Sequence, residues 1–340
     1  MKTQIVYVLV SSEKDVFLEE LWVSVWSLRR YEPDVTVNVI VDEPTAKRVK
    51  ANVELMTLIT NVVVADVPEK YTPKERSREI KTRIRDLIKG DFFYIDTDTV
   101  ICKPLGDIDN CEYDVAGIPD SNVFLKDNPF AGGMISSVKE IFGSDVSNCE
   151  YLINGGVIYA KDNQVAHELF RRWNKNWTYS CFEKGNSQDQ PALWQSDHVM
   201  GNVIKLLPDV YNSQVAMSLQ YFADAAIVHF LHMNFIPDQS YSPYLSLKIY
   251  KDIKAAGKLT PDIKELIINC KSSFTPLTMP IGRDQLLFLF TPMGKTFVQI
   301  YKDGGVASWL MLNMSSLLER LHKFTCKKKS LVSTKKRMSL

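Results

Sequence analysis

The chain has 340 residues, of which 45% are hydrophobic and 24% charged, and its formal net charge is +1. This length suits one large or two moderate globular domains, and the balanced charge points to no particular partner; no nucleic acid partner is expected. No apolar run reaches the roughly 20 residues that a transmembrane helix needs, and the N-terminus predicts a strand instead of a signal peptide. Six cysteines without a C-x-x-C pair favour a reducing, cytoplasmic location over a zinc or redox site.

The N-terminal part alternates predicted strands and helices, and Ser11-Ser12 offers a cap for the first helix. The expected order is strand 4–10, helix 13–30, strand 36–41, helix 45–58, strand 62–65, a helix that ends at Gly90 and strand 92–95. Further strands are predicted at 115–118, 153–160, 203–207 and 226–230, with helices at 164–176 and 189–195. This alternation predicts an α/β fold with crossover helices.

The turn after the first strand, Val10-Ser11-Ser12-Glu13-Lys14, contains no glycine. It therefore lacks both the G-x-G-x-x-G pattern of dinucleotide-binding domains and the phosphate-binding loop of P-loop NTPases. A sugar nucleotidyltransferase would also be expected to have a glycine-rich loop here.

Asp96-Thr97-Asp98 is the most informative motif. It follows the apolar strand Phe92-Phe93-Tyr94-Ile95, and ligands bind at the carboxyl ends of strands in α/β sheets. Two adjacent carboxylates repel each other unless a cation holds them, so a divalent cation bound to a diphosphate is expected. The alternative is that the two aspartates only cap a turn.

The segment Phe92–Val100 resembles the DxD segment of nucleotide-sugar glycosyltransferases with the GT-A fold, closest to the retaining family 8 type. Three later segments occur in the family's order: Leu152–Ile158, Ser187–Leu193 and Ile227–Phe230. The resemblance implies a GT-A domain over residues 1–245, a Rossmann-like mixed sheet with flanking helices. A helical C-terminal extension, 246–322, and a basic tail, 323–340, would follow.

The resemblance also implies roles for individual residues. Asp96, Asp98 and His229 would bind Mn²⁺ or Mg²⁺, with mixed oxygen and imidazole ligands favouring Mn²⁺. The expected substrate-binding residues are Lys81, Asp96, Thr97, Asn154, Gly155, Gly156 and Asp189. Gln190, with Asp189, would be catalytic and lie near the anomeric carbon, for a transfer that retains configuration without a covalent intermediate.

Each of these residues also has a structural alternative. His229 can be a buried structural histidine, Asn154-Gly155-Gly156 a simple turn into a strand, and Asp189 a helix cap. The family continues past this histidine with Gly and Lys where this chain has His232 and Phe235. Lys81, Arg78 or Arg83 would have to replace that lysine at the diphosphate, unless they only form a solvated helix face; His232 is another candidate, or an alternative metal ligand.

Two other functions remain open from the sequence. A haloacid dehalogenase-type phosphatase also has a strand followed by D-x-D-x-T, with Asp96 as nucleophile and Asp98 as acid/base. Three β-α units precede the motif here, however, and no later G-D-x-x-x-D pair occurs. The other alternative is a catalytically degenerate protein that binds sugar nucleotides.

The C-terminal end combines the apolar stretch 306–318 with a basic tail. Eight basic residues and no acidic residue occur between Arg320 and Leu340. This composition is typical of peripheral attachment to an anionic membrane surface, although a core-packed last helix remains the alternative. Together these features predict transfer of a hexose from a UDP-sugar to a glycan or glycolipid acceptor, in the assembly of a bacterial surface glycan at the inner face of the membrane.

Overall fold

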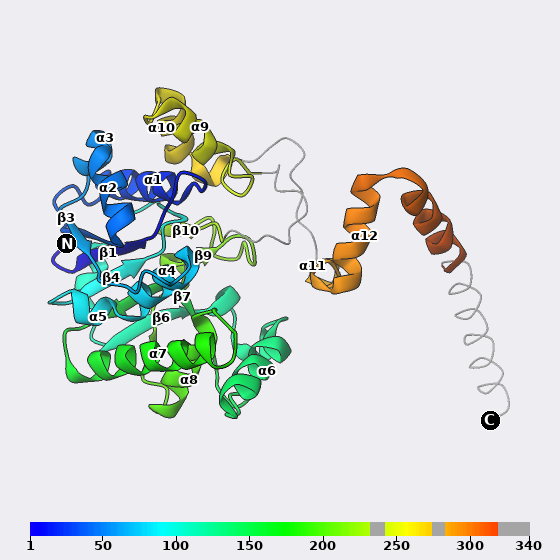
Figure 1. The fold of residues 1–340 in the computed structure, drawn as a ribbon, viewed down its shortest axis with the longest axis horizontal. Helices are drawn as coiled ribbons and strands as arrows, with labels where there is room; N and C mark the ends of the chain where they lie inside the picture. Colours follow the sequence, from blue (N-terminus) through cyan, green and yellow to red (C-terminus); the bar gives the residue numbers. More distant parts are fainter. Residues whose placement is uncertain (232–241, 274–282, 319–340) are drawn as a thin grey trace. The chain divides into compact units, whose positions relative to one another are not determined.

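The structure, a computed structural model, describes residues 1–231, 242–273 and 283–318 (Figure 1). The described residues fall into two compact units, the first of 1–231 and 242–273 and the second of 283–318. Residues 246–273, which the sequence analysis places in the C-terminal extension, belong to the first unit in this division; the predicted domain boundaries stay a prediction.

The first unit is built on a seven-stranded mixed sheet in the order β3-β2-β1-β4-β7-β6-β8. Only β7 runs antiparallel to its neighbours. The strands are β1 (Gln4–Leu9), β2 (Val37–Val41), β3 (Asn61–Val64), β4 (Phe92–Ile95), β6 (Val115–Pro119), β7 (Ile153–Ala160) and β8 (Lys205–Leu206). This arrangement confirms the predicted mixed α/β sheet.

A second, three-stranded sheet has the order β5-β10-β9. Its strands are β5 (Thr99–Ile101), β9 (Ser213–Gln214) and β10 (Ile227–His229). β10 runs antiparallel to β5, with His229 opposite Thr99. This small sheet therefore brings the end of β10 beside the residues that follow β4. The sequence did not predict β5 or β9, which are only three and two residues long.

Helices cover both faces of the large sheet (Figure 1). They are α1 (Phe17–Arg29), α2 (Glu43–Ala51), α3 (Val53–Met56), α4 (Pro73–Thr82), α5 (Ile84–Leu87), α6 (Ala131–Phe142), α7 (Gln164–Phe182), α8 (Gln190–Val199), α9 (Lys248–Ala256) and α10 (Pro261–Ile268). Alternate residues of β1 point to opposite faces of the sheet. Ile5, Tyr7 and Leu9 pack in the core that contains α1. Val6 and Val8 pack in the core that contains α4 and α7. Burial on both faces explains why the central strands are continuously apolar.

The first helix begins later than the sequence predicted. The hydroxyls of Ser11 and Ser12 both donate hydrogen bonds to Asp15, which also accepts from the backbone of Phe17. These serines therefore form a turn and do not cap a helix at residue 13, so that prediction was wrong. The predicted helix 45–58 is also interrupted, because the side chain of Asn52 accepts from Leu55 N and starts α3.

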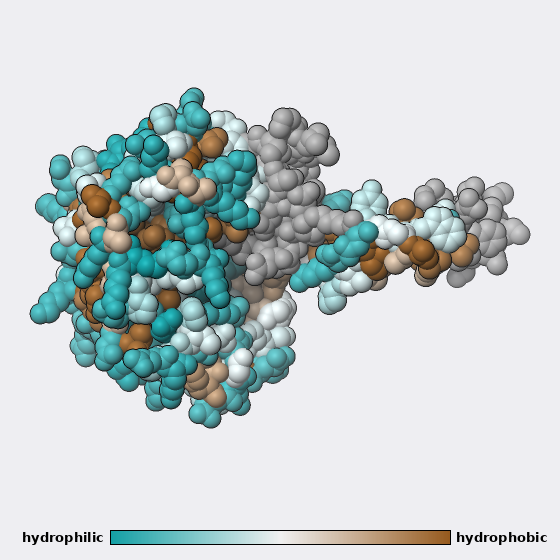
Figure 2. All heavy atoms as spheres, turned by 45° about the horizontal axis from the view of Figure 1, so that its top comes forward, coloured by the Kyte–Doolittle hydropathy of each residue, from teal (hydrophilic) through white to brown (hydrophobic). Residues whose placement is uncertain are grey.

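The second unit contains α11 (Arg283–Phe290), α12 (Pro292–Asp303) and a helical segment at 305–318. Large apolar side chains are exposed on this segment, including Trp309, Met314 and Leu318, each more than 60% exposed. Figure 2 shows hydrophobic residues gathered on the surface of this unit. Within the residues that the structure describes, no helix is both long and apolar enough to cross a membrane.

Candidate metal centre and the adjoining polar site

Asp96, Thr97 and Asp98 form the turn between β4 and β5. Asp96 N donates to Gly156 O at 2.7 Å, which extends the pairing of β4 with β7 by one residue. Thr99 Oγ1 then donates back to Asp96 O at 2.9 Å. The backbone at the carboxyl end of β4 is therefore held on both sides, and its two carboxylates are partly exposed.

Asp96, Asp98 and His229 lie together, as the sequence predicted. One ligand atom from each residue lies within 4.8 Å of the others. His229 Nε2 is 3.0 Å from Asp98 Oδ1. Nε2 is buried, and with the ring neutral and its proton on Nδ1 this nitrogen has no hydrogen-bond partner in the described part of the chain. An imidazole nitrogen beside two carboxylates suits a divalent cation, so the donor set fits a metal.

The other nitrogen of His229 is held by Asn212. His229 Nδ1 lies 2.8 Å from Asn212 Oδ1, and Asn212 Nδ2 donates to Asn154 Oδ1 at 3.1 Å. Because its NH₂ group is used for Asn154, Asn212 presents its oxygen to the histidine. His229 therefore carries its proton on Nδ1, which leaves the lone pair of Nε2 for a metal.

The charges around His229 favour a cation at this point. Burial by itself lowers the pKa of the imidazole, but the Asp98 and Asp96 carboxylates together outweigh burial and raise the pKa above its ordinary value of 6.5. The same negative potential that stabilises a proton on the ring also attracts a metal ion, so the two compete for one site.

Gly156 allows the three groups to approach one another. A Cβ atom at this position would lie 2.4 Å from His229 Cε1 and 2.8 Å from Asp96 Oδ2. A Cβ at Gly155 would meet only ordinary contacts, the nearest being Asp189 Oδ2 and Lys81 Nζ at 3.7 Å. The glycine pair is thus more than a turn: Gly156 borders the candidate metal centre, and Gly155 borders the polar site beside it.

Lys81 lies between two carboxylates and is buried. Its Nζ is 3.2 Å from Asp96 Oδ1 and 3.4 Å from Asp189 Oδ2. Tyr94 OH also donates to Asp96 Oδ1, and burial with the nearby Asp96 charge raises the pKa of this tyrosine. Lys81 therefore does not belong to a solvated helix face, and it links the metal centre to Asp189.

Arg78 is the second cation at Asp189. Its Nε lies 2.9 Å from Asp189 Oδ1. Burial by itself raises the pKa of Asp189, but Arg78 and Lys81 together outweigh it and hold the pKa below its usual range. Arg83 instead points to Glu79 and to the carbonyl of Asp66. Of the three cations that the sequence suggested, Lys81 and Arg78 lie at the site and Arg83 does not.

Asp189 and Gln190 stand at the start of α8, as predicted. The Asp189 side chain makes no capping hydrogen bond, so the alternative of a simple helix cap is wrong. Gln190 Nε2 donates to Asp120 Oδ2 at 2.8 Å, and the same oxygen lies 3.4 Å from Asn154 Nδ2. Asp120 thus joins two predicted site residues.

The sequence analysis missed Asp120 and Asn212. Asp120 comes two positions after the predicted strand 115–118 and directly follows β6, so its place after a strand was a usable signal, as for Asp96. Asn212 lies between a 3₁₀ turn and the short strand β9, where the sequence offers no comparable pattern.

Two other residues named from the sequence are Thr97 and His232. Thr97 Oγ1 lies 3.4 Å from Glu20 Oε2, and His232 falls outside the described residues.

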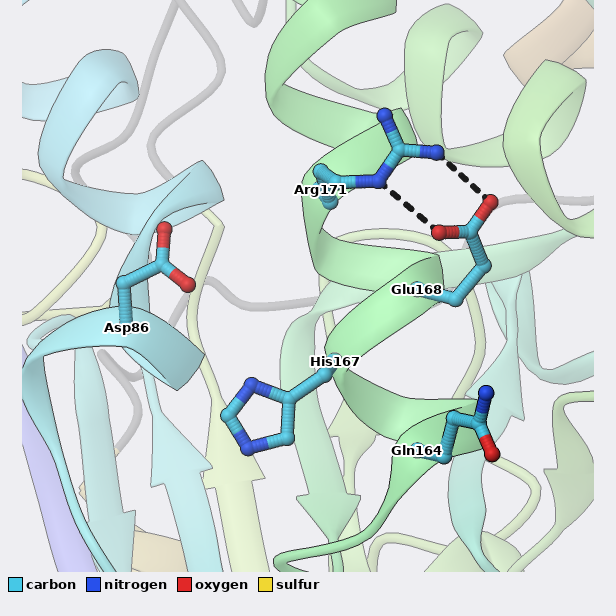
Figure 3. A pocket seen from close by; sticks show the side chains of 5 residues that line it. All are labelled: Asp86, Gln164, His167, Glu168 and Arg171. Atoms are coloured by element: carbon cyan, nitrogen blue, oxygen red, sulfur yellow. Dashed lines mark hydrogen bonds and ion pairs between the residues drawn. The ribbon is translucent and has the colours of Figure 1, made fainter.

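A surface hollow between α5 and α7 is unrelated to these residues (Figure 3). It is lined by Asp86, Gln164, His167, Glu168 and Arg171. Three of its side chains are already paired, with Arg171 bound to Glu168 through two hydrogen bonds and His167 bound to Asp162. None of the predicted site residues lines it.

Comparisons with known proteins identify the fold. No family model and no curated protein sequence matches the chain. Among solved structures, the galactosyltransferase LgtC, in complex with donor and acceptor sugar analogues, aligns with 77% of this chain and 99% of its own at a TM-score of 0.50 and 12% identity. The bifunctional glycosyltransferase WbbM aligns with 78% of this chain at a TM-score of 0.49 and 14% identity. The glycosyltransferase GlyE of Streptococcus pneumoniae TIGR4 aligns with 82% of this chain and 67% of its own at a TM-score of 0.48 and 15% identity.

The likeness to LgtC defines the class of fold: a GT-A fold, with a mixed sheet between helices and a helical C-terminal region. The chain spans about half the length of WbbM, of which it covers 51%. At these identities the comparisons establish the fold alone, so the activity is argued from the site.

Proposed function

We propose that this protein is a metal-dependent glycosyltransferase that transfers a hexose from a nucleoside diphosphate sugar to a glycan or glycolipid acceptor. The observation that carries the proposal is the meeting of Asp96 and Asp98 with His229, whose buried Nε2 is left without a hydrogen bond. These residues lie at the carboxyl end of β4 in a GT-A fold, where a diphosphate and its cation are expected.

Asp96, Asp98 and His229 would hold the cation, and their mixed oxygen and nitrogen donors favour Mn²⁺ over Mg²⁺. When bound, such a cation supplies Lewis acidity that stabilises the negative charge of the leaving diphosphate. Asn212 keeps His229 in the ligating tautomer, and Asp96 also contacts the ribose together with Thr97. The donor is a UDP-sugar in this proposal, by analogy with the retaining family 8 enzymes.

The polar site next to the metal centre would bind the sugar. Asp189 and Asn154 offer oxygen and amide groups for hydroxyls, and Gly155 has no side chain to fill the space beside Asp189 and Lys81. Gln190 lies against Asp120 and would sit near the anomeric carbon. No described carboxylate in the motifs is placed as an obvious nucleophile, so we propose transfer on the same face of the sugar with retention and without a covalent intermediate.

Positive charge for the donor would come from α4 instead of the lysine that the chain lacks after His229. Lys81 is already shared between Asp96 and Asp189. Arg78 uses Nε on Asp189, and within the described residues its other two nitrogens make no hydrogen bond or ion pair. A guanidinium has donors enough to hold a carboxylate and a second anion together, so we assign Arg78 to the donor.

Measurement of donor hydrolysis tests the proposal directly. We expect slow release of UDP from a UDP-sugar that requires Mn²⁺ and falls at least about 100-fold in Asp98→Asn. Asp107→Asn, a change of an exposed aspartate nearby, is the matched control and should keep full activity. Metal-independent hydrolysis, or equal rates in the two variants, would refute the metal assignment.

Two other results would favour the alternative functions. Phosphate release from simple phosphoesters without any sugar nucleotide would favour the phosphatase. Binding of UDP without turnover would favour a catalytically degenerate protein that binds sugar nucleotides.

The location that fits this function is the cytoplasmic face of a membrane. Helical segment 305–318 exposes Trp309, Met314 and Leu318, and the basic tail, residues 323–340, which follows in sequence, lies outside the described residues. Apolar side chains inserted at the interface and cations near anionic headgroups reinforce each other. We propose that this end holds the enzyme near a lipid-linked acceptor during synthesis of a surface polysaccharide.

A further inference from the structure

Cys102 and Cys270 lie side by side although 168 residues separate them in sequence. Cys102 directly follows β5, and Cys270 begins a short 3₁₀ helix (Cys270–Ser272) after α10. Their sulfur atoms are 3.2 Å apart, and neither is bonded to another cysteine. A disulfide requires them to approach by only about 1.2 Å more.

Both cysteines are held to the same segment of the chain, Cys102 by its backbone and Cys270 through the side chain of its neighbour Lys271. Cys102 N donates to Ala226 O at 2.7 Å. Lys271, the neighbour of Cys270, donates through Nζ to the carbonyls of Ala223 and Ala225 at 2.9 and 2.8 Å. This segment leads directly into β10. The two sulfurs are therefore brought together by the fold itself and not only by the orientation of two side chains.

The two thiols differ in a way that suits an ordered reaction. Cys102 is partly exposed, whereas Cys270 is 2% exposed. A hydrogen bond from Cys270 lowers the pKa of the Cys102 thiol despite burial, and Lys271 adds to this effect. The same hydrogen bond, together with burial, raises the pKa of Cys270. Cys102 is thus the more acidic thiol and the one that meets a reagent from solvent, and Cys270 is the less acidic partner behind it.

We propose that Cys102 and Cys270 form a reversible intramolecular disulfide by exchange with a small-molecule disulfide such as glutathione disulfide. The Cys102 thiolate attacks one sulfur of glutathione disulfide, whose S–S bond breaks and releases one glutathione thiolate. Cys270 then loses its proton, and its sulfur attacks Cys102 Sγ and expels the second glutathione. The two protein thiols are oxidised, one glutathione disulfide is reduced to two thiols, and these take up the two protons.

Closing this bond fastens the α9–α10 segment to the small sheet. Tyr244, which precedes α9, stacks on Phe230 with ring centroids 4.2 Å apart, and its hydroxyl donates to Leu266 O on α10. Phe230 directly follows His229. The disulfide would therefore brace, from the opposite end of β10, the strand that carries His229, and it would close a loop of about 170 residues in the unfolded chain.

The experiment treats the reduced, full-length protein with glutathione disulfide and compares it with an untreated sample. We expect the count of free thiols under denaturing conditions to fall from six to four, with an intact mass lower by two hydrogens. A peptide map should contain one new link, from Cys102 to Cys270. The Tm should rise by about 5 °C and return to its starting value with dithiothreitol.

Serine variants separate this bond from general oxidation. Cys102→Ser and Cys270→Ser should each lose both the link and the rise in Tm. Cys149→Ser, a change of another partly exposed cysteine, should retain them. The wild-type protein decides the matter even if a variant folds poorly. Glutathione adducts without loss of two hydrogens, a link between other cysteines, or an unchanged Tm after oxidation would overturn the proposal.

Discussion

His229 and Asn212 form a hydrogen bond of 2.8 Å between the imidazole Nδ1 and the amide oxygen, and this bond determines what His229 can do. Asn212 is fully buried, and its NH₂ group is used by Asn154 Oδ1. The amide group of Asn212 is therefore fixed with its oxygen toward His229 Nδ1. The buried polar chain from Asp120 through Asn154 and Asn212 to His229 connects the expected sugar end of the site to the metal end.

Replacing Asn212 by alanine should weaken metal binding without removing a ligand. With its Nδ1 partner lost, His229 is free to change tautomer and orientation, and such changes around metal ligands cost about 10- to 100-fold in affinity. Titration with Mn²⁺ measures this loss, and circular dichroism verifies the fold. Asn110→Ala, at an exposed position, serves as the control. Equal Mn²⁺ affinity in both variants would show that Asn212 does not orient His229.

Gly156→Ala and Gly155→Ala should damage different functions. A methyl group at Gly156 would lie 2.4 Å from His229 Cε1, and neither the β7 backbone nor the histidine ring can yield easily. We expect Gly156→Ala to lose Mn²⁺ binding. Gly155→Ala places its methyl group 3.7 Å from Asp189 and Lys81, so metal binding should persist while KM for the donor rises. Retained Mn²⁺ affinity in Gly156→Ala would contradict this assignment.

The sequence predicted the central sheet and the aspartates of the candidate metal centre because both have short-range signals. Buried strands are apolar throughout, and Asp96 and Asp98 follow one of them directly. Asp189 and Lys81 were found, but their ion pair was not predictable, since it depends on how α4 and α8 meet. Asn212 and Cys270 were missed for the same reason: each matters through a partner that is distant in sequence, and nothing near them marks the contact.

Stability should depend on Asp197, a buried carboxyl of α8 remote from the proposed chemistry. Burial raises its pKa to about 6. The backbone N–H of Ile204 and the nearby side chains of Lys205 and His198 act in the opposite direction but do not outweigh burial. Cys149 and Tyr151 also face this carboxyl. The folded protein then holds this proton more tightly than the unfolded chain. Its stabilising effect is complete below about pH 4 and is lost as the pH rises through 6.

Asp197→Asn removes this dependence because the amide is neutral at every pH and keeps an oxygen for Ile204. Relative to the wild type, the variant should gain about 1–2 kcal/mol in the free energy of unfolding between pH 4.5 and 7.5. Urea denaturation at the two pH values measures the gain. A difference between the proteins that does not change with pH would rule out titration of Asp197 as its source.

The C-terminal end should bind vesicles that contain anionic lipid. Removal of residues 306–340 deletes the exposed apolar segment and the basic tail, and co-sedimentation should then be lost. Changing Lys327, Lys328 and Lys329 to glutamine retains the apolar part and should weaken binding by about 3 kcal/mol, or roughly 100-fold, at moderate salt. Binding that persists after the deletion would end the membrane proposal.

Variants of Arg78 and Lys81 test which residues supply positive charge to the donor diphosphate, since the chain lacks the lysine expected after His229. Lys81 neutralises both Asp96 and Asp189, so Lys81→Gln leaves two carboxylates without their shared cation and should reduce both Mn²⁺-dependent turnover and stability. Arg78→Gln removes one partner of Asp189 and the proposed contact with the donor. We expect kcat/KM for the UDP-sugar to fall about 10- to 100-fold while Mn²⁺ affinity stays unchanged.

The matched control for Arg78→Gln is Arg83→Gln, because Arg83 directly follows α4 but is bound to Glu79 and to the Asp66 carbonyl. Its loss should leave the kinetics of donor hydrolysis as they are. Arg78→Lys keeps one charge but not the planar fork, so partial rescue by lysine would indicate that charge matters most, and no rescue that two nitrogens act together. If Arg78→Gln and Arg83→Gln give the same kcat/KM as the wild type, other residues bind the negatively charged diphosphate of the donor, and Arg78 serves only to hold Asp189.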